Sequence, residues 1–577
     1  MIETTWAIKR KAPQKQFETF SEYDPISIQL LYNRGIKTQT KIDEFFNPDF
    51  DQDLHDPYLF KDMERAVKRI VEAVENNERV GIYGDYDADG VTASVVLTEL
   101  FKALGLKGQV YIPDRKKEGY GLNKKAIDYL KRKDVSLIVT CDCGVSNKKE
   151  IDYAKEEHGI GVVVLDHHHV PTVFEKKYIV VDAKQKGDTY PEKELSAVGV
   201  TFKLAEAFFR YENKYLLVKN KEAFIKWLLD VVAIGTVADC VPLLSENRTL
   251  VTYGLKVISK MKRLGIQEMF KHAAIKPPVN SYHLGYMIGP RINAAGRIDH
   301  ANVGYKLLVT KNKKEAYLFA EKLERTNKRR QNLSDKIFKE AVGKIEKEKK
   351  LEKIIIVGKK DWPQGVLGIV AGKLSEKYAR PVIAFSLGKE CVGSGRGPVT
   401  FDLIKAIESC EDLLLEFGGH QQAAGLTVKK KNYQAFKKKI ESIAGKKLKQ
   451  KDIIKKIEID AKLKLNDINW NLQKIIDKVA PYGEANPEPV FVVEGVAIDS
   501  FTLVGSNKSH LKISVKDEKG SKKDCIAFSL GQRVGELTIG TKIDIVFHIL
   551  LNEWNGVRNL ELQIMDFKLS KEPNEEK

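Results

Sequence analysis

The sequence predicts a multidomain α/β protein that ends in a small β-barrel or sandwich. The chain has 577 residues, which corresponds to about four domains at roughly 150 residues per domain. Between residues 79 and 265, short β-branched runs alternate with helical segments, as in a parallel sheet covered on both faces. After residue 510, short strand-like runs follow one another at regular spacing, separated by turn signals, which is typical of a small barrel.

The first α/β region is predicted to hold five strands with helices between most of them. A helix is expected over 91–104, directly after the first strand, and another over 221–237. Ligands bind at the carboxyl ends of the strands in such sheets, and the acidic residues of this sequence collect there. The predicted strands are 79–84, 109–113, 135–140, 161–166 and 178–182.

Three further regions follow the first one. Residues 314–347 form a charged helical pattern in which apolar residues recur at four-residue spacing, and we expect a helix that connects two domains. A second α/β unit starts at 353–358 and extends to about residue 445. In the last region the predicted strands are 510–517, 524–529, 542–550 and 559–567.

The composition fits a soluble globular chain and argues against several other classes. No apolar run approaches the ~18 residues that cross a bilayer, and the first residues lack the apolar core of a secretory signal. The six cysteines contain no Cys-x-x-Cys pair. Neither a disulfide framework nor a zinc finger is therefore indicated, and we expect a reducing, cytoplasmic location.

The charge of the chain is strongly positive, with 97 basic against 79 acidic residues and a net charge of +18. Such an excess suits a polyanionic partner, because basic groups near phosphates release counterions. A lysine-rich, solvated surface is the alternative. The excess is concentrated in residues 429–456, where twelve lysines stand against Glu441 and Asp452, a local net charge of +10.

An acidic motif directly follows the first predicted strand. In GDYDADG (84–90), Asp85, Asp87 and Asp89 lie two residues apart, and in an extended chain they would face the same side. Carboxylates held together in this way repel one another unless a cation lies between them. A calcium loop is one alternative, but Val96 stands where that loop needs Glu, and a strand precedes the motif instead of a helix. A solvated acidic turn is the other alternative.

Three more motifs bring ligand-type side chains to the ends of predicted elements. Asp142 lies in TCDCGVS, three histidines follow Asp166 in LDHHHV, and Asp239 follows a helical stretch. Imidazole together with several carboxylates suits Mn²⁺, with Mg²⁺ possible, and Asp166 could orient a liganding histidine. Taken singly, Asp142 and Asp239 have ordinary turn positions as the alternative, and Cys141 and Cys143 are expected to be core residues. Together the groups exceed one metal's needs and suit two ions about 3.5–4 Å apart.

The order and context of these motifs resemble the DHH phosphoesterases, and within them the RecJ family of exonucleases. The resemblance rests on D-x-D-x-D-G, the Asp in TCDCG, DHH and the Asp in GTVADCVPL, together with six further motifs. It implies a parallel-sheet DHH catalytic domain, a long connecting helix, a second α/β DHH-associated domain and a C-terminal OB-fold barrel. The further motifs are PDRKKEGYGLN (113–123), GPRINAAGR (289–297), GVLGIVAGKL (365–374), GSGR (393–396), FGGHQQAAGLTV (417–428) and PYGEANPEPVF (481–491).

The domain limits that we expect combine this resemblance with the predicted elements. They are an N-terminal segment at 1–50, the DHH catalytic domain at 51–265, a helical connector at 266–350, the DHH-associated nucleic-acid-binding domain at 351–450 and the OB-fold domain at 451–577.

The resemblance also implies roles for the acidic and histidine residues. It assigns two divalent ions, Mn²⁺ by preference or Mg²⁺, to one set of ligands, with Asp142 as the bridge between the ions. His168 matches the second histidine of DHH, which in the family faces the scissile phosphate, and Asp142 and Asp166 complete the catalytic set. The metal ligands are Asp87, Asp89, Asp142, His167 and Asp239, with Asp85 as a further ligand.

The associated domain supplies the expected contacts to nucleic acid. Its FGGHQQAAG motif resembles the part of that domain that contacts nucleic acid, with His420 as the polar contact and glycines that admit a phosphate, a tight turn being the alternative. In GSGR, Ser394 and Arg396 could hold a terminal 5′-phosphate, because the planar arginine fork binds phosphate bidentately. Arg115, Arg291 and Arg297 are the expected partners, with an ordinary surface charge as the alternative for each arginine.

The last region resembles an OB-fold, which follows single strands with basic grooves and stacking aromatic side chains. The candidate contacts are His510, Lys512, Phe528, Trp554 and Arg558. Three positions depart from the family pattern. Pro363 follows Trp362 where the family usually has histidine, Ala485 replaces the usual glycine in PYGEAN, and the additional His169 has no assigned role.

The resemblance implies a single-stranded-DNA-specific 5′→3′ exonuclease that releases 5′-mononucleotides and acts in DNA recombination and repair. The implied partners are single-stranded DNA with a 5′ end, and in addition a single-strand-binding protein and a helicase, with the chain itself a monomer. One alternative is a DHH phosphodiesterase for short oligonucleotides, cyclic dinucleotides or pyrophosphate, which would not need residues 451–570. Another is an inactive scaffold that binds single strands, which would be marked by lost metal ligands.

Overall fold

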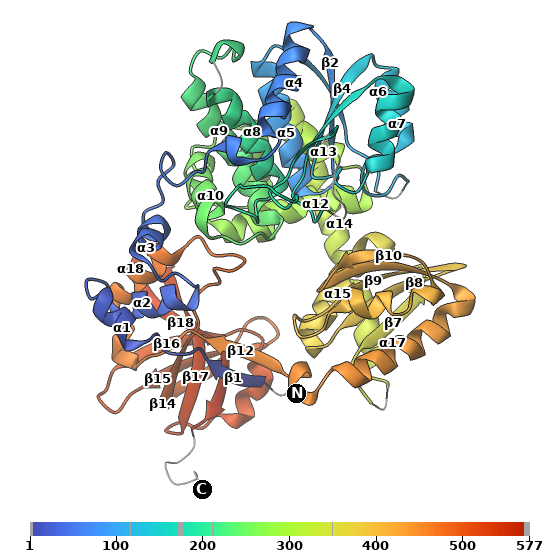
Figure 1. The fold of residues 1–577 in the computed structure, drawn as a ribbon. Coiled ribbons are helices and arrows are strands. Elements are labelled where there is room, and N and C mark those ends of the chain that lie inside the picture. The colour runs from blue at the N-terminus through green and yellow to red at the C-terminus, as the bar shows by residue number, and fades with distance from the viewer. Residues whose placement is uncertain are drawn as a thin grey trace. The chain divides into compact units, whose positions relative to one another are not determined.

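The computed structural model describes residues 4–115, 117–170, 177–210, 213–348, 350–554 and 556–570 (Figure 1). The chain forms two compact units. The first unit consists mainly of Asp56–Asp239 and Gly254–Lys455, and the second of Trp6–His55, Cys240–Tyr253 and Lys456–Lys577. Among the described helices, none combines the length and the apolar character that crossing a membrane requires.

A five-stranded parallel sheet in the order β3-β2-β4-β5-β6 forms the centre of the first unit, which confirms the predicted sheet. Its strands carry buried β-branched side chains because helices cover both faces. The helices α6 and α7 pack on one face, whereas α5 and α8 contact the strands from the other. The strands are β2 (Arg79–Gly84), β3 (Lys107–Tyr111), β4 (Val135–Cys141), β5 (Gly161–Leu165) and β6 (Ile179–Val181). The helices are α4 (Met63–Glu75), α5 (Ala88–Ala103), α6 (Lys124–Lys131), α7 (Lys148–His158), α8 (Ala197–Arg210) and α9 (Lys221–Ala238).

One sequence prediction at this sheet is wrong. The chain does not stay extended from Asp85 to Asp89, because α5 begins at Ala88. The Asp87 side chain caps that helix by accepting hydrogen bonds from the backbone N–H groups of Asp89 and Gly90. Short polar side chains favour this capping position, so the motif that follows the strand also starts the helix.

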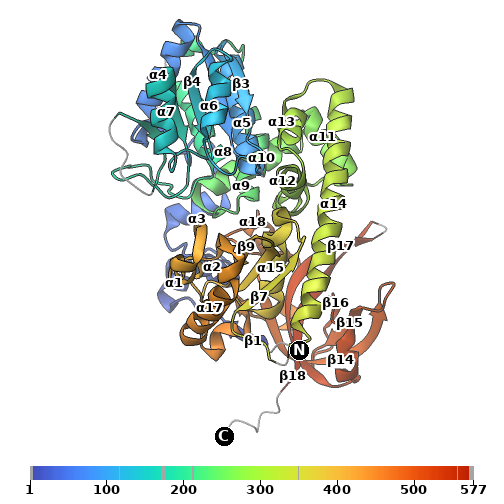
Figure 2. The ribbon, with the colours of Figure 1, turned by 90° about the vertical axis from the view of Figure 1, so that its right-hand side faces the viewer.

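A helical region links the sheet to the rest of the first unit. Its longest helix, α14 (Lys313–Ile345), confirms the predicted connecting helix. Figure 2 shows α11, α12 and α13 beside the first half of α14 and α15 beside the second half, in agreement with their contacts. The other elements are α11 (Leu264–His272), the π-helical turn η3 (His283–Ile288), α12 (Gly289–Ile298) and α13 (Asn302–Val309), and α10 (Ser245–Ile258), most of whose residues belong to the second unit, precedes them.

A second sheet, in the order β10-β11-β9-β8-β7, completes the first unit. Only β7 and β8 are parallel, and the other neighbours are antiparallel. One face packs against α14 and α15, whereas α16 and α17 cover the other. The elements are β7 (Ile355–Lys360), α15 (Gln364–Tyr378), β8 (Val382–Leu387), β9 (Glu390–Arg396), α16 (Leu403–Glu408), β10 (Leu414–His420), β11 (Ala423–Lys429) and α17 (Tyr433–Lys447).

The second unit contains a closed five-stranded barrel, because β14 pairs with both β15 and β17. Four of its strands were predicted, but β14 was missed. Glu494 and Gly495 interrupt its apolar pattern, Gly495 has φ of +71°, and the register with β17 shifts between Val493 and Val496. The strands are β14 (Phe491–Val504), β15 (His510–Lys516), β16 (Lys522–Ala527), β17 (Lys542–Trp554) and β18 (Val557–Leu569).

The N-terminal segment belongs to the same core as this barrel. Phe20, Leu30 and Leu31 pack in one apolar cluster with barrel residues such as Phe491 and Phe547. The helices are α1 (Gln14–Thr19), α2 (Pro25–Asn33), α3 (Gln39–Phe46) and α18 (Trp470–Val479), and the short strands are β1 (Thr4–Ile8), β12 (Lys455–Ile459) and β13 (Ala461–Lys462).

Candidate metal centre and phosphate pocket

The strand register brings the acidic motifs of the first unit together. Gly84 at the end of β2 pairs with Cys141 of β4, and Cys141 pairs with Leu165 of β5. The residue that follows each of these strand ends is an aspartate: Asp85, Asp142 and Asp166. Three motifs that are far apart in the sequence therefore meet at the carboxyl edge of one sheet.

The side chains at this edge form three overlapping groups. Within each group, the ligand atoms of the three residues lie within 4.8 Å of one another. His167 Nε2 lies 3.4 Å from Asp142 Oδ1, and His167 Nδ1 lies 3.7 Å from Asp239 Oδ2. Asp142 and His167 each belong to two of the groups, so these two residues join the cluster together. The groups are Asp85–Asp87–Asp142, Asp142–His167–His168 and Asp89–His167–Asp239.

Local backbone structure fixes several of these side chains. Asp142 has φ of +63°, a left-handed conformation that aspartate tolerates better than most residues. Asp89 lies in the first turn of α5, and its two oxygens accept hydrogen bonds from the backbone N–H groups of Ala197 and Val198 in α8. Asp239 directly follows the last residue of α9. Cys141 and Cys143 are buried, as expected for core residues.

The cluster carries more negative charge than its surroundings compensate. Burial and the neighbouring Asp87 carboxylate raise the pKa of Asp85 and of Asp142 well above the usual value, and raise that of Asp89 to about 7. Burial, with a smaller contribution from the charge of His168, lowers the pKa of His167 to about 4. The imidazole is therefore neutral at pH 7, as a metal ligand must be.

The donor set of this cluster fits divalent cations. Asp85 Oδ1 and His167 Nε2 are buried and have no hydrogen-bond partner among the described residues, although such atoms are normally paired. Carboxylate oxygens with one or two imidazole nitrogens suit Mn²⁺ and also accommodate Mg²⁺. A cation bound here would satisfy both unpaired atoms and remove the repulsion between the carboxylates.

His168 is held at the edge of the cluster by its neighbours. Its Nδ1 lies 2.8 Å from Asp166 Oδ1 and 3.2 Å from the Tyr120 hydroxyl. Burial alone would raise the pKa of Asp166, but the hydrogen bond and charge of His168 outweigh burial and keep the pKa below its usual value. Asp166 also accepts a backbone hydrogen bond from Val145, so its own position is fixed. This arrangement orients the His168 ring and leaves Nε2 to contact a ligand.

Tyr120 is a site residue that the sequence analysis missed. Its hydroxyl donates to the Asp142 carbonyl oxygen at 3.0 Å, and its ring meets the His168 ring edge-on with the centroids 5.6 Å apart. The residue lies inside the quoted motif PDRKKEGYGLN. An aromatic residue between two glycines in that motif was the available signal.

A pocket of about 500 Å³ elsewhere in the first unit collects three of the four expected arginines. Arg115, Arg297 and Arg396 line it together with Ser394. None of the three arginines forms an ion pair with a described carboxylate. Burial lowers the pKa of Arg297 to about 10, and the positive charges of Arg115 and Arg396 contribute to the shift. Glu416 is the one acidic residue in the lining, so the pocket keeps an excess of positive charge that a phosphate group would neutralise.

Glycines in the quoted motif GVLGIVAGKL allow this pocket to form. A Cβ on Gly368 of α15 would lie 3.0 Å from Ser394 Oγ and 3.1 Å from Arg396 Nη2. A Cβ on Gly365 would collide with the carbonyl oxygen of Arg297. The missing side chains let α15 pack closely against β9 and α12.

Arg291 does not lie in the pocket where the sequence analysis expected it. Its Nε donates to Glu324 Oε2 at 2.7 Å, and it anchors α12 to α14. Arg291 and Arg297 are six residues apart on one helix, which places them on different sides of it. His420, at the end of β10, does not line the pocket either. Burial lowers the pKa of His420, and the charges of His168, Lys184 and His169 act in the same direction, so His420 lies within electrostatic reach of the DHH motif.

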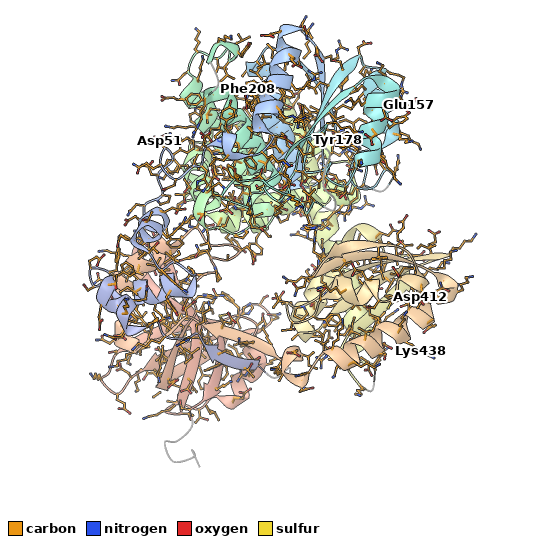
Figure 3. The ribbon with its side chains drawn as sticks, viewed as in Figure 1. Asp51, Glu157, Tyr178, Phe208, Asp412 and Lys438 are labelled. Carbon is orange, nitrogen blue, oxygen red and sulfur yellow. The ribbon has the colours of Figure 1, made fainter. Side chains whose placement is uncertain are left out.

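The lysine-rich segment lies on the other face of the second sheet. The pocket is lined from the α15 side, whereas α17 packs with α16 on the opposite face. Most lysines of the segment are exposed, including Lys438, which Figure 3 labels on α17. The strongest local charge of the chain therefore does not form the phosphate pocket.

The second unit has a groove of about 1100 Å³ on its barrel, and Lys512 is the only expected OB-fold contact that lines it among the described residues. The His510 and Phe528 rings meet edge-on, 5.3 Å apart, and Arg558 pairs with Glu553 at 2.8 Å. The side chain of Trp554 lies outside the described part of the structure. Trp470 of α18, which the sequence analysis did not select, lines the groove and is 48% exposed.

The departures from the family pattern have simple structural settings. Pro363 directly precedes α15, and the neighbouring Trp362 is buried with Nε1 donating to Glu340. Ala485 has φ of +58°, which explains why glycine suits that position. His169 is exposed.

Three family descriptions match separate parts of the chain. Residues 79–236 match the N-terminal domain of the DHH family, residues 336–446 the DHHA1 domain, and residues 459–566 the RecJ OB domain. These ranges agree with the parallel sheet, the second sheet and the closed barrel of the structure.

Curated proteins resemble this chain over nearly its whole length. The single-stranded-DNA-specific exonuclease RecJ of Bacillus subtilis is 35% identical over 98% of this chain and 71% of the relative. The protein of the same name from Haemophilus influenzae is 31% identical over 94% of this chain and 95% of the relative.

Solved structures give the same result. The crystal structure of Thermus thermophilus RecJ in complex with Mn²⁺ has a TM-score of 0.83, 27% identity, and coverage of 99% of this chain and 80% of that one. The complex of the same protein with Mg²⁺ has a TM-score of 0.78 and 25% identity, and covers 99% of this chain and 79% of that one. The fold, the order of the motifs and these relatives agree, and the chain belongs to the RecJ family.

Proposed function

We infer that this chain is a single-stranded-DNA-specific exonuclease that hydrolyses phosphodiester bonds from the 5′ end and depends on divalent metal ions. The observation that carries this inference is the cluster of aspartates and histidines at the carboxyl edge of the parallel sheet. Its unpaired ligand atoms and raised carboxylate pKa values call for cations. Relatives that match almost the whole chain are named as exonucleases of this type.

We propose that the cluster holds two ions, with Mn²⁺ preferred over Mg²⁺. Asp85 and Asp87 would hold one ion, Asp89, His167 and Asp239 the other, and Asp142 would bridge the two. When bound, such a pair neutralises charge on the phosphate and lowers the pKa of water for attack. Asp142 shares a group with Asp85 and Asp87, and its Oδ1 also lies 3.4 Å from Nε2 of His167, a proposed ligand of the other ion, which supports the bridging role.

His168 and Asp166 complete the proposed catalytic set. Asp166 accepts a hydrogen bond from the Nδ1 side of His168 and fixes the orientation of the ring. His168 Nε2 would then donate a hydrogen bond to an oxygen of the scissile phosphate and stabilise the charge that develops there. Tyr120 helps to hold the same edge of the ring, since its hydroxyl also lies close to Nδ1, at 3.2 Å.

The arginine pocket would select the 5′ end of the strand. Arg115, Arg297, Ser394 and Arg396 line a volume of about 500 Å³, which is large enough for a terminal phosphate and its sugar. Binding the terminal phosphate there and the next phosphodiester at the metal centre would release 5′-mononucleotides. His420 is proposed as a further contact to the strand.

Beyond the catalytic unit, the barrel would bind a single strand, with Lys512 as the basic contact in its groove. Arg558, which does not line the groove, and Trp554 are proposed as further contacts of the barrel. We propose the domain limits 1–50, 51–265, 266–350, 351–450 and 451–577 for functional dissection. A single-strand-binding protein and a helicase are the proposed protein partners, and the chain is proposed to act as a cytoplasmic monomer in recombination and repair.

The test uses the purified full chain with Mn²⁺ and a single-stranded oligonucleotide labelled at its 5′ or its 3′ end. Immediate release of a 5′-labelled mononucleotide, absent in Asp142→Ala and retained in the exposed control Glu157→Ala, supports the proposal. Persistence of long strands while dinucleotides are hydrolysed would instead indicate a phosphodiesterase for short oligonucleotides. Release from the 3′ end would contradict the proposed direction.

A further inference from the structure

An exposed aromatic pair lies where a helical segment packs against α9, the helix that ends directly before the proposed ligand Asp239. The rings of Tyr282 and Tyr286 stack with centroids 5.0 Å apart and an angle of 24° between their planes. They are 59% and 74% exposed, and Tyr286 has the largest exposed fraction among the described large hydrophobic side chains. Single exposed apolar residues are common, but a stacked and mostly exposed pair calls for an explanation.

Tyr286 lies on η3, a π-helical turn that packs against α9, and Tyr282 directly precedes this turn. A Cβ on Gly285 would lie 3.3 Å from Val237 Cγ1, and a Cβ on Gly289 would lie 3.0 Å from the Ala238 Cβ. Both contacts fall on the last turn of α9, directly before the proposed ligand Asp239. The aromatic pair is therefore carried by a turn that rests on the end of a ligand-bearing helix, and such π-helical turns often occur at functional sites.

The same helix continues past the metal centre to the phosphate pocket. Asn293 Oδ1 accepts a hydrogen bond from the backbone N–H of Ala88, between Asp87 and Asp89. Four residues later, Arg297 lines the pocket. The segment η3–α12 thus contacts the end of α9 first, then the acidic loop, and ends at the proposed site of the 5′-phosphate.

The segment from the aromatic pair to the pocket arginine is several nucleotides long. Tyr282 and Tyr286 lie four residues apart at the π-helical turn, and Asn293 and Arg297 lie four residues apart on α12. Each pair therefore occupies about one turn of its own stretch of helix. At about 1.5 Å per residue, the eleven residues from Tyr286 to Arg297 span roughly 16 Å. Stacked nucleotides are spaced about 3.4 Å apart, so this distance covers about four or five of them.

We propose that Tyr286 and Tyr282 form a stacking platform for the bases on the 3′ side of the scissile bond, beginning about four nucleotides from the 5′ end. This inference rests on the proposed function, since it assigns the strand that leaves the metal centre to a particular surface. Aromatic side chains suit an unspecific single strand, because every base has a π-face. Continuity with the metal centre and the phosphate pocket along one helix identifies the occupant as that strand.

The test measures KM and kcat on 5′-phosphorylated oligothymidylates of 2, 4, 8 and 20 nucleotides. For the 20-mer, Tyr286→Leu is expected to raise KM roughly 5- to 100-fold, since stacking contributes ~1–3 kcal/mol per base and each ~1.4 kcal/mol is a factor of ten. The effect is expected to grow with length and to be smallest for the dinucleotide, with little change in kcat. Tyr286→Phe keeps the ring and is expected to restore the wild-type KM.

Tyr317→Leu is the matched control. Tyr317 is a half-exposed tyrosine of α14 whose ring lies against His272, 5.3 Å away, and it has no place in the proposed path. Its replacement is expected to leave KM within twofold of wild type at every length. An equal loss of activity at all lengths in Tyr286→Leu would indicate a disturbed Asp239 and would overturn the platform, as would an unchanged KM for the 20-mer.

A second arm removes the bases instead of the tyrosines. An oligonucleotide with abasic units at positions 4–8 should raise the wild-type KM to that of Tyr286→Leu, and the variant should then show no further rise. If the abasic units and the Tyr286→Leu substitution instead raise KM by factors that multiply, the inference is overturned. Dissociation constants are also measured by fluorescence anisotropy in EDTA, where no cleavage is expected. They should change with the substitution and with the abasic units in the same pattern as KM. If the wild type cuts no strand, the proposed function fails, and these dissociation constants decide the platform by themselves.

Discussion

The metal centre and the arginine pocket are both clusters of like charges in one unit, but they differ in sign and in assembly. The metal centre collects carboxylates whose pKa values are raised by burial and by one another. The pocket collects guanidinium groups, and burial with neighbouring positive charges lowers the pKa of Arg297 and Arg396. Each cluster is therefore unfavourable alone and would be neutralised by a ligand of the opposite charge. Cations bound at the metal centre and a phosphate bound in the arginine pocket fit a nuclease that binds the end of a strand.

The two clusters also differ in how the chain assembles them. The carboxylates follow directly from the ends of neighbouring parallel strands, so a local motif and a strand pattern locate them. The pocket draws on a loop after β3, on α12, on α15 and on three strands of the second sheet, and it depends on glycines that allow close packing. The sequence therefore locates the carboxylates of the metal centre from short motifs, whereas the arginine pocket depends on how distant elements pack.

The largest expected effect comes from removing the charge of the proposed bridging ligand. Asp142→Asn keeps the size of the side chain but should lower kcat/KM on single-stranded DNA by about a thousandfold or more, because metal catalysis supplies several kcal/mol. Steady-state rates in Mn²⁺ measure the effect. Activity within tenfold of wild type would mean that the cluster does not carry the chemistry.

A buried arginine outside the pocket sharpens the comparison, because carbonyl oxygens of the protein accept its hydrogen bonds. Arg248 donates hydrogen bonds to the carbonyl oxygens of Phe45, Lys478, Val479 and Ala480 and lies 3.8 Å from the Phe45 ring. Arg248→Ala would leave these carbonyls unpaired and should lower the free energy of unfolding of the second unit by about 3 kcal/mol. Chemical denaturation followed by circular dichroism measures this.

A structural role distinguishes Arg248 from the pocket arginines. Its replacement should leave the preference for 5′-phosphorylated strands intact. A variant of wild-type stability would show that these hydrogen bonds add nothing.

The pocket itself is tested by its selectivity for the end of the strand. Arg396→Ala should raise KM for a 5′-phosphorylated oligonucleotide about 10- to 100-fold, since a charge-assisted bidentate contact contributes about 1.5–3 kcal/mol. The same strand with a 5′-hydroxyl should show a much smaller change. Arg291→Lys, outside the pocket, should keep the wild-type selectivity. An equal rise in KM for the 5′-phosphorylated and the 5′-hydroxyl strand would assign Arg396 to general strand binding.

The smallest expected effect concerns stability without metal. Burial and neighbouring carboxylates raise the folded-state pKa of Asp142, so its ionised form destabilises the folded protein at neutral pH. In EDTA at pH 7, Asp142→Asn should therefore increase the free energy of unfolding by about 1–2 kcal/mol. As the pH falls from 7 towards 5, the free energy of unfolding of the wild type should increase. The increase should be smaller for the variant. A destabilised variant in EDTA would contradict the repulsion.

Much of the fold could be predicted from sequence because its strands are buried on both faces. Runs such as 79–84 and 135–140 are continuous and apolar, and they form β2 and β4. The strand β14 was missed because Glu494 and the left-handed Gly495 interrupt its pattern. The segment after Asp85 was wrongly expected to stay extended, because a capping aspartate and a strand-end ligand look alike in a short motif.

The candidate sites show the same limit. Asp85, Asp142 and Asp166 were selected correctly as neighbours, since each follows a strand of one parallel sheet. The positions of Arg291 and of Tyr120 depend on which side of an element faces the site, and one motif does not determine that. Trp470 reaches the groove of the barrel from a helix outside it, a contact between distant parts of the sequence.

The most direct test of the central claim counts Mn²⁺ ions bound per chain, by equilibrium dialysis with electron paramagnetic resonance of the free ion. The wild type is expected to bind two ions, and coupling between them should broaden the bound signal. Asp142→Asn should lose the coupling and at least one ion, whereas the exposed control Glu157→Ala should bind like the wild type. A wild type that binds no Mn²⁺, or an Asp142→Asn variant that binds two coupled ions, would contradict the proposed metal centre.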